Sequence, residues 1–320
     1  MVSDSVLCLK LKTFHDIHDW SSAIRVATER TTRRIVIVIF HEVFNSNPGF
    51  SHTGCWSAVQ SLLSTVYVEA TGVSQQANRI LMDVDVLLCG FDKPPNISPV
   101  DEINHIFTGG DVPDIPLQDW VKRLPKTELS RNSNATDCTH PNRPDNNIKE
   151  RPPSYPTVAL GGTFDHLHSG HKILLSMAAW IAHEKIIVGM TDDKLLRNKA
   201  NKEVLENLST RISRVRRFLE MFKPGLQYHL VPLDDVAGPT GVDPNIQALV
   251  VSKETISGAE AIARIRNEKG FPPLECFVID VISATSADLV AEDMEWLRKT
   301  KMSSTFIREW IVKNKGSDKL

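Results

Sequence analysis

The stretch YPTVALGGTFDHLHSGH, residues 155–171, joins a short apolar run to a turn that is rich in glycine and histidine. The apolar run predicts a buried strand, and the segment from Gly170 onward predicts a helix. Gly161 and Gly162 permit a tight turn in which a ligand can approach the backbone closely. The start of the helix presents unpaired N–H groups and the positive end of its dipole, so the stretch predicts an anion site.

The alternation of strands and helices continues after this turn. Apolar strands are predicted at residues 157–161, 185–190, 226–232, 247–252 and 275–282, and helices begin near residues 170, 209, 257 and 303. This pattern indicates a parallel sheet covered on both faces, a Rossmann-like, doubly wound α/β fold. Ligands of such sheets bind at the carboxyl ends of the strands, where the turn lies. In the helix of residues 209–222 the apolar stripe faces the sheet, and Arg211 is predicted to point elsewhere.

A flexible linker is predicted between two domains. Residues 125–153 are rich in Asn, Pro, Ser, Thr and charge and contain few large apolar residues. The fold described above therefore occupies residues 154–320, and a separate domain occupies residues 1–124. Apolar runs at 34–40 and 83–91 predict that this first domain is a smaller α/β unit, and its role is not evident from its residues.

Composition excludes several classes of protein. A net charge of -2 and a pI near 6.6 argue against binding of nucleic acid by bulk electrostatics. The five cysteines form no CxxC pair, so neither a disulfide framework nor a cysteine zinc site is predicted. No secretory or mitochondrial signal is recognisable, and no apolar run approaches the roughly 20 residues of a membrane span. We therefore expect a cytoplasmic protein, with a nuclear location as the alternative.

Two groups of histidines raise the question of a metal site. His166, His168 and His171 lie in the turn, but a turning backbone directs them differently, and apart from Asp165 no nearby Cys, Asp or Glu completes a convincing ligand set. His15 and His18 also lack a third ligand and are predicted at the surface. His168 and His171, three positions apart across the helix start, could instead donate hydrogen bonds to phosphate oxygens. The alternative is a tight connection with capping or surface histidines.

Two motifs together resemble a known family. The first is carried by Gly162, Thr163, Phe164, Asp165, His168, Gly170 and His171, and resembles the signature of the nucleotidyltransferase superfamily, Gly-Thr/Ser-Phe-Asp followed by His/Thr-x-Gly-His. The second, KMSSTFIREWI at residues 301–311, resembles the Ser-Ser-Ser/Thr loop of phosphopantetheine adenylyltransferases. Residues 189–199 and 249–272 are similar to the eukaryotic and archaeal type of that enzyme. The resemblance covers residues 155–315.

This resemblance implies transfer of the adenylyl group of ATP to 4′-phosphopantetheine, which gives dephospho-coenzyme A and diphosphate. His171 would contact the ATP phosphates and stabilise the charge that develops at the α-phosphorus, with His168 as its partner. Thr163 would contact the attacking phosphate. Lys194, as a third catalytic residue, would bind this nucleophile or the transition state, and Lys199 is the alternative contact to the substrate. The remaining ATP-binding residues implied are Gly162, Phe164, Gly170, Arg264, Arg266, Ser303, Ser304 and Thr305. His166 is interpreted as incidental, and the choice between Arg264 and Arg266 stays open.

The chemistry implied requires no covalent intermediate and no general base, because the attacking phosphate is already an anion. Mg²⁺ is expected on the ATP phosphates rather than in a protein cage. The chain contains no Gly-x-x-x-x-Gly-Lys-Ser/Thr loop, so a separate dephospho-coenzyme A kinase is expected, and other enzymes of coenzyme A synthesis are candidate partners. The alternatives are a cytidylyltransferase for a lipid head group, whose second motif resembles Arg-Thr-x-Gly-Ile-Ser-Thr, and a scaffold for those enzymes.

Overall fold

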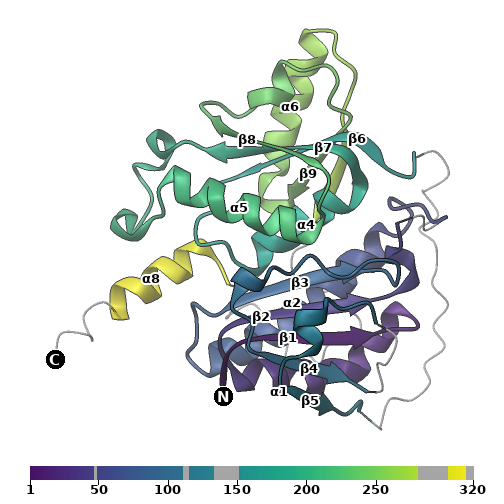
Figure 1. The fold of residues 1–320 in the computed structure, drawn as a ribbon. Coiled ribbons are helices and arrows are strands. Elements are labelled where there is room, and N and C mark those ends of the chain that lie inside the picture. The colour runs from purple at the N-terminus through teal and green to yellow at the C-terminus, as the bar shows by residue number, and fades with distance from the viewer. Residues whose placement is uncertain (47–48, 111–114, 133–150, 280–301, 315–320) are drawn as a thin grey trace. The chain divides into compact units, whose positions relative to one another are not determined.

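The computed structural model describes residues 1–46, 49–110, 115–132, 151–279 and 302–314. The chain divides into two compact units, Met1–Pro153 and Ser154–Leu320. Each unit contains a five-stranded parallel sheet flanked by helices (Figure 1). The predicted α/β class and the Rossmann-like parallel sheet are therefore confirmed.

The C-terminal unit is built around strand β6. Its elements are β6 (Tyr155–Gly162), α4 (Ser169–Ile181), β7 (Ala182–Thr191), α5 (Leu208–Phe222), β8 (Gln227–Leu233), β9 (Ala248–Ser252), α6 (Ile256–Glu268), β10 (Glu275–Ile279) and α8 (Ser304–Asn314). The strand order is β10-β9-β6-β7-β8. The chain runs outward from β6 to β8 and then returns to the other side of β6, so the order reverses between β6 and β9. The carboxyl end of β6 at Gly162 adjoins this reversal, which is where ligands bind in such sheets.

Helices cover both faces of this sheet. Figure 1 shows α4 and α5 on one face and α6 on the other. The face beneath α6 contains an apolar cluster of Ala159, Ile187, Ile246, Leu249, Val251 and Ile262. Helix α5 buries Val215, Phe218, Leu219 and Phe222 as its spacing predicts. Arg211 is also fully buried, so the prediction that it points away from the fold was wrong. Its guanidinium finds partners among backbone carbonyls, which compensates the loss of water.

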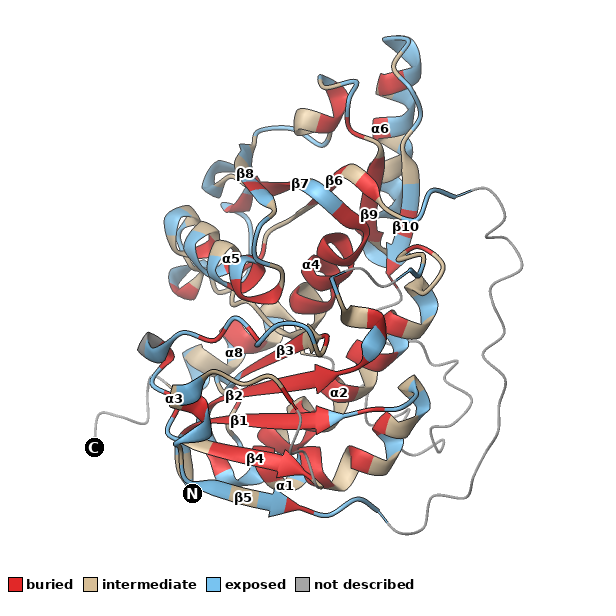
Figure 2. Cartoon of the chain, turned by 45° about the vertical axis from the view of Figure 1, so that its right-hand side comes forward, coloured by how far each residue is buried: buried red, intermediate tan, exposed pale blue. Residues whose placement is uncertain are grey.

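The N-terminal unit has its own central strand. Its elements are β1 (Val2–Lys10), α1 (Ser21–Arg30), β2 (Thr31–Phe40), α2 (Trp56–Gln76), β3 (Asp83–Cys89), β4 (His105–Gly109), α3 (Asp119–Lys122) and β5 (Lys126–Leu129), in the strand order β3-β2-β1-β4-β5. The apolar runs at 34–40 and 83–91 form β2 and most of β3, as predicted. Figure 2 shows that β1, β2 and β4 are largely buried, with the apolar core on both faces of the sheet.

The predicted linker over residues 125–153 is wrong at both ends. Residues 126–129 form β5, which pairs with β4 in parallel register. This edge strand carries no apolar run because backbone hydrogen bonds, rather than side chains, attach it to the sheet. At the other end, Thr53 donates its N–H to the carbonyl of Pro153 (3.1 Å) and its hydroxyl to that of Pro152 (2.7 Å). The middle of the predicted linker, 133–150, lies outside the described residues.

Among the helices in the described part of the chain, none is both long enough and apolar enough to cross a membrane.

Candidate functional site

The turn after β6 is held in an unusual backbone conformation. Phe164 and His166 have φ values of 51° and 44°, which non-glycine residues rarely adopt. Such a conformation costs on the order of 1–3 kcal/mol per residue and persists only where surrounding contacts fix it. His168 then takes the N-cap position of α4 with an extended backbone, and its side chain makes no capping bond. The conformation of the turn therefore depends on its tertiary contacts.

Phe164 supports the motif from inside the fold. Its residue surface is fully buried, and a Cβ atom added to Gly162 would lie 3.2 Å from its ring. Glycine at position 162 thus makes room for the ring beneath the turn. The ring centroid lies 5.3 Å from that of His171. Phe164 was predicted to bind ATP, but it offers no surface to a nucleotide, so this structure corrects its role to support of His171.

His168 and His171 are brought together at the start of α4. Their ring centroids lie 3.9 Å apart and the rings are stacked. Burial lowers the pKa of His171 to about 4, against the opposing influence of the Asp165 carboxylate, so the ring is neutral at pH 7. Within the described residues, the buried Nδ1 of His171 has no hydrogen-bond partner. A neutral imidazole has one N–H donor and one acceptor, which suits it to bind a phosphate oxygen.

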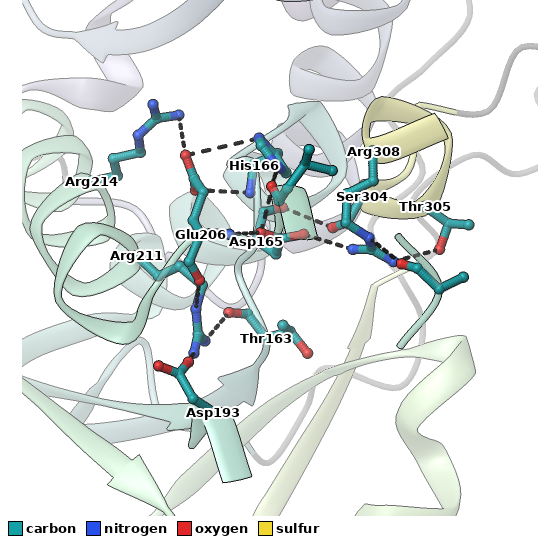
Figure 3. Close-up of polar contacts among 12 residues, drawn as sticks. Thr163, Asp165, His166, Asp193, Glu206, Arg211, Arg214, Ser304, Thr305 and Arg308 are labelled. Carbon is teal, nitrogen blue, oxygen red and sulfur yellow. Dashed lines mark hydrogen bonds and ion pairs between the residues drawn. The ribbon is translucent and has the colours of Figure 1, made fainter. Parts of the chain in front are cut away.

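Asp165 connects the two sequence motifs. Its Oδ2 lies 2.6 Å from Nη1 of Arg308, and its backbone carbonyl accepts the hydroxyl of Ser304 at 2.8 Å (Figure 3). Its Oδ1 accepts the N–H of Glu206 at 2.9 Å. Asp165 and Arg308 are both almost fully buried, at 0% and 3% exposure. The start of α8 is thereby fastened to the turn after β6, and Arg308 is a residue of the candidate site that the sequence did not predict.

The second motif begins α8. Ser303 accepts the N–H of Phe306 through its Oγ at 3.2 Å, which is the arrangement of an N-cap. Arg308 donates from Nη2 to the Thr305 hydroxyl at 3.2 Å and from Nε to the carbonyl of Ala200 at 2.9 Å. The first N–H groups of a helix have no partners within the helix, so this end of α8 can receive an anion. The structure therefore brings the predicted residues 303–305 to the same turn as Asp165.

His166 has a structural role, contrary to the interpretation that it is incidental. Its Nε2 lies 2.7 Å from the carbonyl of Val204, so this nitrogen carries the proton and donates. Its backbone N–H donates to Oε2 of Glu206 at 3.0 Å, and Glu206 also pairs with Arg214 at 2.9 Å. These contacts hold the segment before α5 against the turn. They also explain how the backbone of His166 keeps its positive φ.

One cluster in the described residues has the composition of a metal site. Potential ligand atoms of Asp165, His166 and Glu206 lie within 4.8 Å of one another. Each group is already engaged, however: Asp165 by Arg308, Glu206 by Arg214, and the His166 ring by a carbonyl. Two guanidinium groups therefore supply the positive charge that a cation would supply. We interpret the cluster as a network that positions the turn.

Arg211 ties the ends of two neighbouring strands to this network. Its guanidinium donates to the carbonyls of Thr163 (2.7 Å), Thr191 (2.9 Å) and Glu206 (3.0 Å). It also forms an ion pair with Asp193. Because Thr163 follows β6 and Thr191 ends β7, the buried guanidinium fixes the carboxyl ends of both strands.

The predicted substrate residues lie at this edge of the sheet. Lys194 is exposed in a 3-10 helix, η4 (Asp193–Leu196), directly after β7, and Asp192 caps that helix by accepting the Lys194 N–H at 2.9 Å. Lys199 is exposed a few residues further on. Thr163 is partly exposed at the end of β6. Arg211, through Asp193, fixes the segment that carries Lys194, and the choice between Lys194 and Lys199 stays a prediction.

The two arginines of α6 differ in their exposure to solvent. Arg264 is exposed, and its role in ATP binding stays a prediction. Arg266 is buried, at 1% exposure. Its guanidinium donates to the carbonyls of Thr240, Asp243, Pro244, Ile246 and Pro272 at 2.6–3.4 Å. All of its donors are thus used within the fold, so the prediction that Arg266 contacts ATP is corrected to a structural role.

Comparison with known proteins agrees with this geometry. Residues 159–310 match the family model described as Cytidylyltransferase-like. A phosphopantetheine adenylyltransferase of Saccharomyces cerevisiae is 47% identical over 160 residues, which cover 50% of this chain and 50% of that protein. The chain therefore spans only half the length of that relative.

Archaeal relatives are covered more completely. A phosphopantetheine adenylyltransferase of Methanopyrus kandleri is 40% identical over 125 residues, which cover 39% of this chain and 78% of that protein. One of Pyrococcus abyssi is 33% identical over 157 residues, which cover 48% of this chain and 90% of that protein. With both motifs joined at Asp165 beside the reversal of strand order, the chain belongs to the phosphopantetheine adenylyltransferase family.

Proposed function

We propose that the chain transfers the adenylyl group of ATP to 4′-phosphopantetheine. The observation that carries this proposal is the junction at Asp165, which joins the N-terminus of α4 and that of α8 in one place. Two helix N-termini that converge on one turn suit a chain of several phosphates better than a single anion. The match covers half of the yeast relative's length, so the activity of that relative does not by itself establish the activity of this chain.

In the proposed reaction, an oxygen of the acceptor phosphate attacks the α-phosphorus of ATP. A new phosphorus–oxygen bond forms there, the bond to the β-phosphate breaks, and diphosphate leaves with the electron pair. The acceptor needs no deprotonation at neutral pH because a phosphate monoester is already ionised, which accords with the absence of a role for a general base. The chain's contribution is therefore to orient the two phosphates and to stabilise the charge between them.

His171 is proposed to stabilise the transition state. Its neutral ring can direct one N–H to an α-phosphate oxygen, and the arriving anion raises the pKa of the ring and favours its charged form. His168 stacks on it and is proposed to contact a neighbouring phosphate oxygen. Thr163 and Lys194 are proposed to hold the acceptor phosphate, with Lys199 as the alternative.

Residues 303–305 are proposed to receive the leaving diphosphate. The start of α8 supplies N–H groups and hydroxyls there, and Arg308 holds it in place. Mg²⁺ is proposed to enter with ATP, since the carboxylates of the described network are occupied by arginines and backbone donors. A cytoplasmic location and association with other enzymes of coenzyme A synthesis, including a separate kinase, remain proposals.

A head-group cytidylyltransferase is the second candidate, because the matching family model is Cytidylyltransferase-like. Diphosphate release by the purified chain separates the two. We expect release with Mg²⁺, ATP and 4′-phosphopantetheine, and little with CTP and phosphocholine. Faster release with CTP and phosphocholine would refute the proposal. Absence of release with either pair, from a folded chain, would favour a scaffold.

A further inference from the structure

The two units share one strand order. Numbered along each unit, the strands lie in the order 3-2-1-4-5 in both sheets, and all pairs are parallel. In both, the connection from the third strand to the fourth contains a short 3-10 helix, and its described residues include no α-helix: η3 (Pro99–Asp101) in one unit and η6 (Gly238–Gly241) in the other. The central strand and the point where the order reverses therefore correspond.

The sequences after the first strands also correspond. The N-terminal unit has Thr13-Phe14 after β1, an apolar residue three positions after the Phe, and His18 next. The C-terminal unit has Thr163-Phe164 after β6, with Leu and then His168 at the same spacing. By this correspondence, His18 occupies the position that His168 has in the first motif of the C-terminal unit.

The correspondence fails at the positions where the family motif has aspartate, glycine and histidine, and Asp165 is matched by His15. Gly170 and His171 of the C-terminal unit are matched by Trp20 and Ser21. The indole of Trp20 is buried, at 6% exposure, and packs over the end of β4. A Cβ atom added to Gly109, the last residue of β4, would lie 2.7 Å from the Trp20 ring. The ring thus fills the space beside the reversal of strand order.

The backbone donors of this turn are also occupied. Asp16 accepts the N–H groups of Lys12 (2.8 Å) and Thr13 (3.1 Å) through its Oδ2, and the Thr13 hydroxyl through its Oδ1 (3.0 Å). A carboxylate of the chain itself therefore takes the donors that an anionic ligand would use. Lys12 stands where the other unit has Gly162, which removes the second open position.

We infer that the N-terminal unit is a second nucleotidyltransferase-type fold whose nucleotide position is closed by Trp20. This inference rests on the proposed function for the nature of the ligand. It predicts that the chain binds ATP in the C-terminal unit alone. Removal of the indole is expected to open the closed position, because an entering anion can then compete with the Asp16 carboxylate for the N–H groups of Lys12 and Thr13. The N-terminal unit then contributes a fold without a nucleotide site.

Titration calorimetry of the full chain with MgATP, without acceptor, tests the inference. We expect no more than one ATP per chain. Trp20→Gly combined with Ser21→His restores the His-x-Gly-His spacing after His18, and we expect one additional, weaker binding event per chain. Ser21→His alone keeps the indole and is the matched control, for which we expect no additional event.

The deciding quantity is the difference between the double variant and the original chain in the number of ATP molecules bound per chain. A folded double variant with no additional event, or an original chain that binds ATP in both units, would overturn the inference. Circular dichroism and melting temperature verify folding, and Trp20→Ala with Ser21→His replaces the double variant if that chain does not fold. An original chain that binds no ATP would count against the proposed function, while that difference would still test the closure.

Discussion

The two units differ at one turn more than in their folds. After β6, glycines, stacked histidines and a buried ion pair form a polar site at the carboxyl edge of the sheet. After β1, Lys12 and the indole of Trp20 stand at the positions of Gly162 and Gly170, and Asp16 accepts the backbone N–H groups. The same strand order thus supports an open turn and a closed one. The difference teaches that the fold provides the location, and that a few residues of the turn decide whether a ligand can enter.

The largest expected effect is loss of the ion pair beneath the open turn. Arg308→Met leaves the Asp165 carboxylate buried without its partner, and we expect the free energy of unfolding to fall by about 3–5 kcal/mol. Turnover should fall as well, since α8 loses its attachment. Arg214→Met is the matched control, because Arg214 is exposed where it pairs with Glu206, and should cost about 0–1 kcal/mol. Equal losses in denaturant titrations of both variants would contradict this account.

The next effect concerns chemistry rather than stability. His171→Ala should lower kcat by about 10²–10³-fold, because it removes the proposed donor to the transition state. The melting temperature should change little relative to this loss of activity. His183→Ala serves as the control, since that ring is exposed on β7 and we expect normal turnover. Near-normal kcat for His171→Ala would remove His171 from the proposed mechanism.

The turn after β6 is expected to make stability depend on pH through His171, whereas the turn after β1 has Ser21 at the corresponding position. The pKa of His171 is lowered to about 4 in the folded chain and has its ordinary value when unfolded. Between pH 4 and 6.5 the unfolded chain therefore binds more protons, so the free energy of unfolding rises with pH across this window. From pH 7 to 4.5 the loss from this residue is about 2 kcal/mol. His171→Gln should flatten the dependence by that amount in denaturant titrations, and an unchanged slope would argue against a buried neutral ring.

The smallest effect is expected in the closed turn. Trp20→Phe keeps an aromatic ring over Gly109 but reduces its volume, so the free energy of unfolding should fall by about 1–2 kcal/mol. Turnover of the folded chain should stay within about twofold, because the closed turn binds no substrate in the proposed mechanism. A large fall in kcat at unchanged stability would show that the N-terminal unit takes part in the reaction.

The sequence predicted the parts of the fold that depend on local pattern. The strands at 185–190 and 247–252 are apolar runs, and the structure contains β7 and β9 there. β5 was missed because Lys126–Leu129 contains only one large apolar residue, and its pairing with β4 is a tertiary event. The helix at 209–222 was found, but the burial of Arg211 depends on carbonyls contributed by other segments.

The site was predictable to the extent that its residues lie in short motifs. The sequence located His168 and His171 at the start of the helix, whereas the stacking of their rings is a finding of the structure. Asp165 stood in the first motif, but its role depends on Arg308, which no local spacing reveals. A basic residue near the start of the amphipathic α8 was the available signal. Arg266 was predicted to contact ATP because it lies in a segment similar to the family. Its guanidinium instead donates to backbone carbonyls of its own unit, which the sequence does not reveal.

The contact between Asp165 and Arg308 also bears on when the site becomes complete. The two residues are 143 positions apart, so the contact closes a long loop, at an entropic cost on the order of 4 kcal/mol. During synthesis the turn after β6 emerges well before the helix that supplies its guanidinium. Until residue 308 has left the ribosome, the aspartate has no such partner and the two motifs cannot meet. A nascent chain can therefore fold its first strands while it still lacks the residues that the proposed reaction requires.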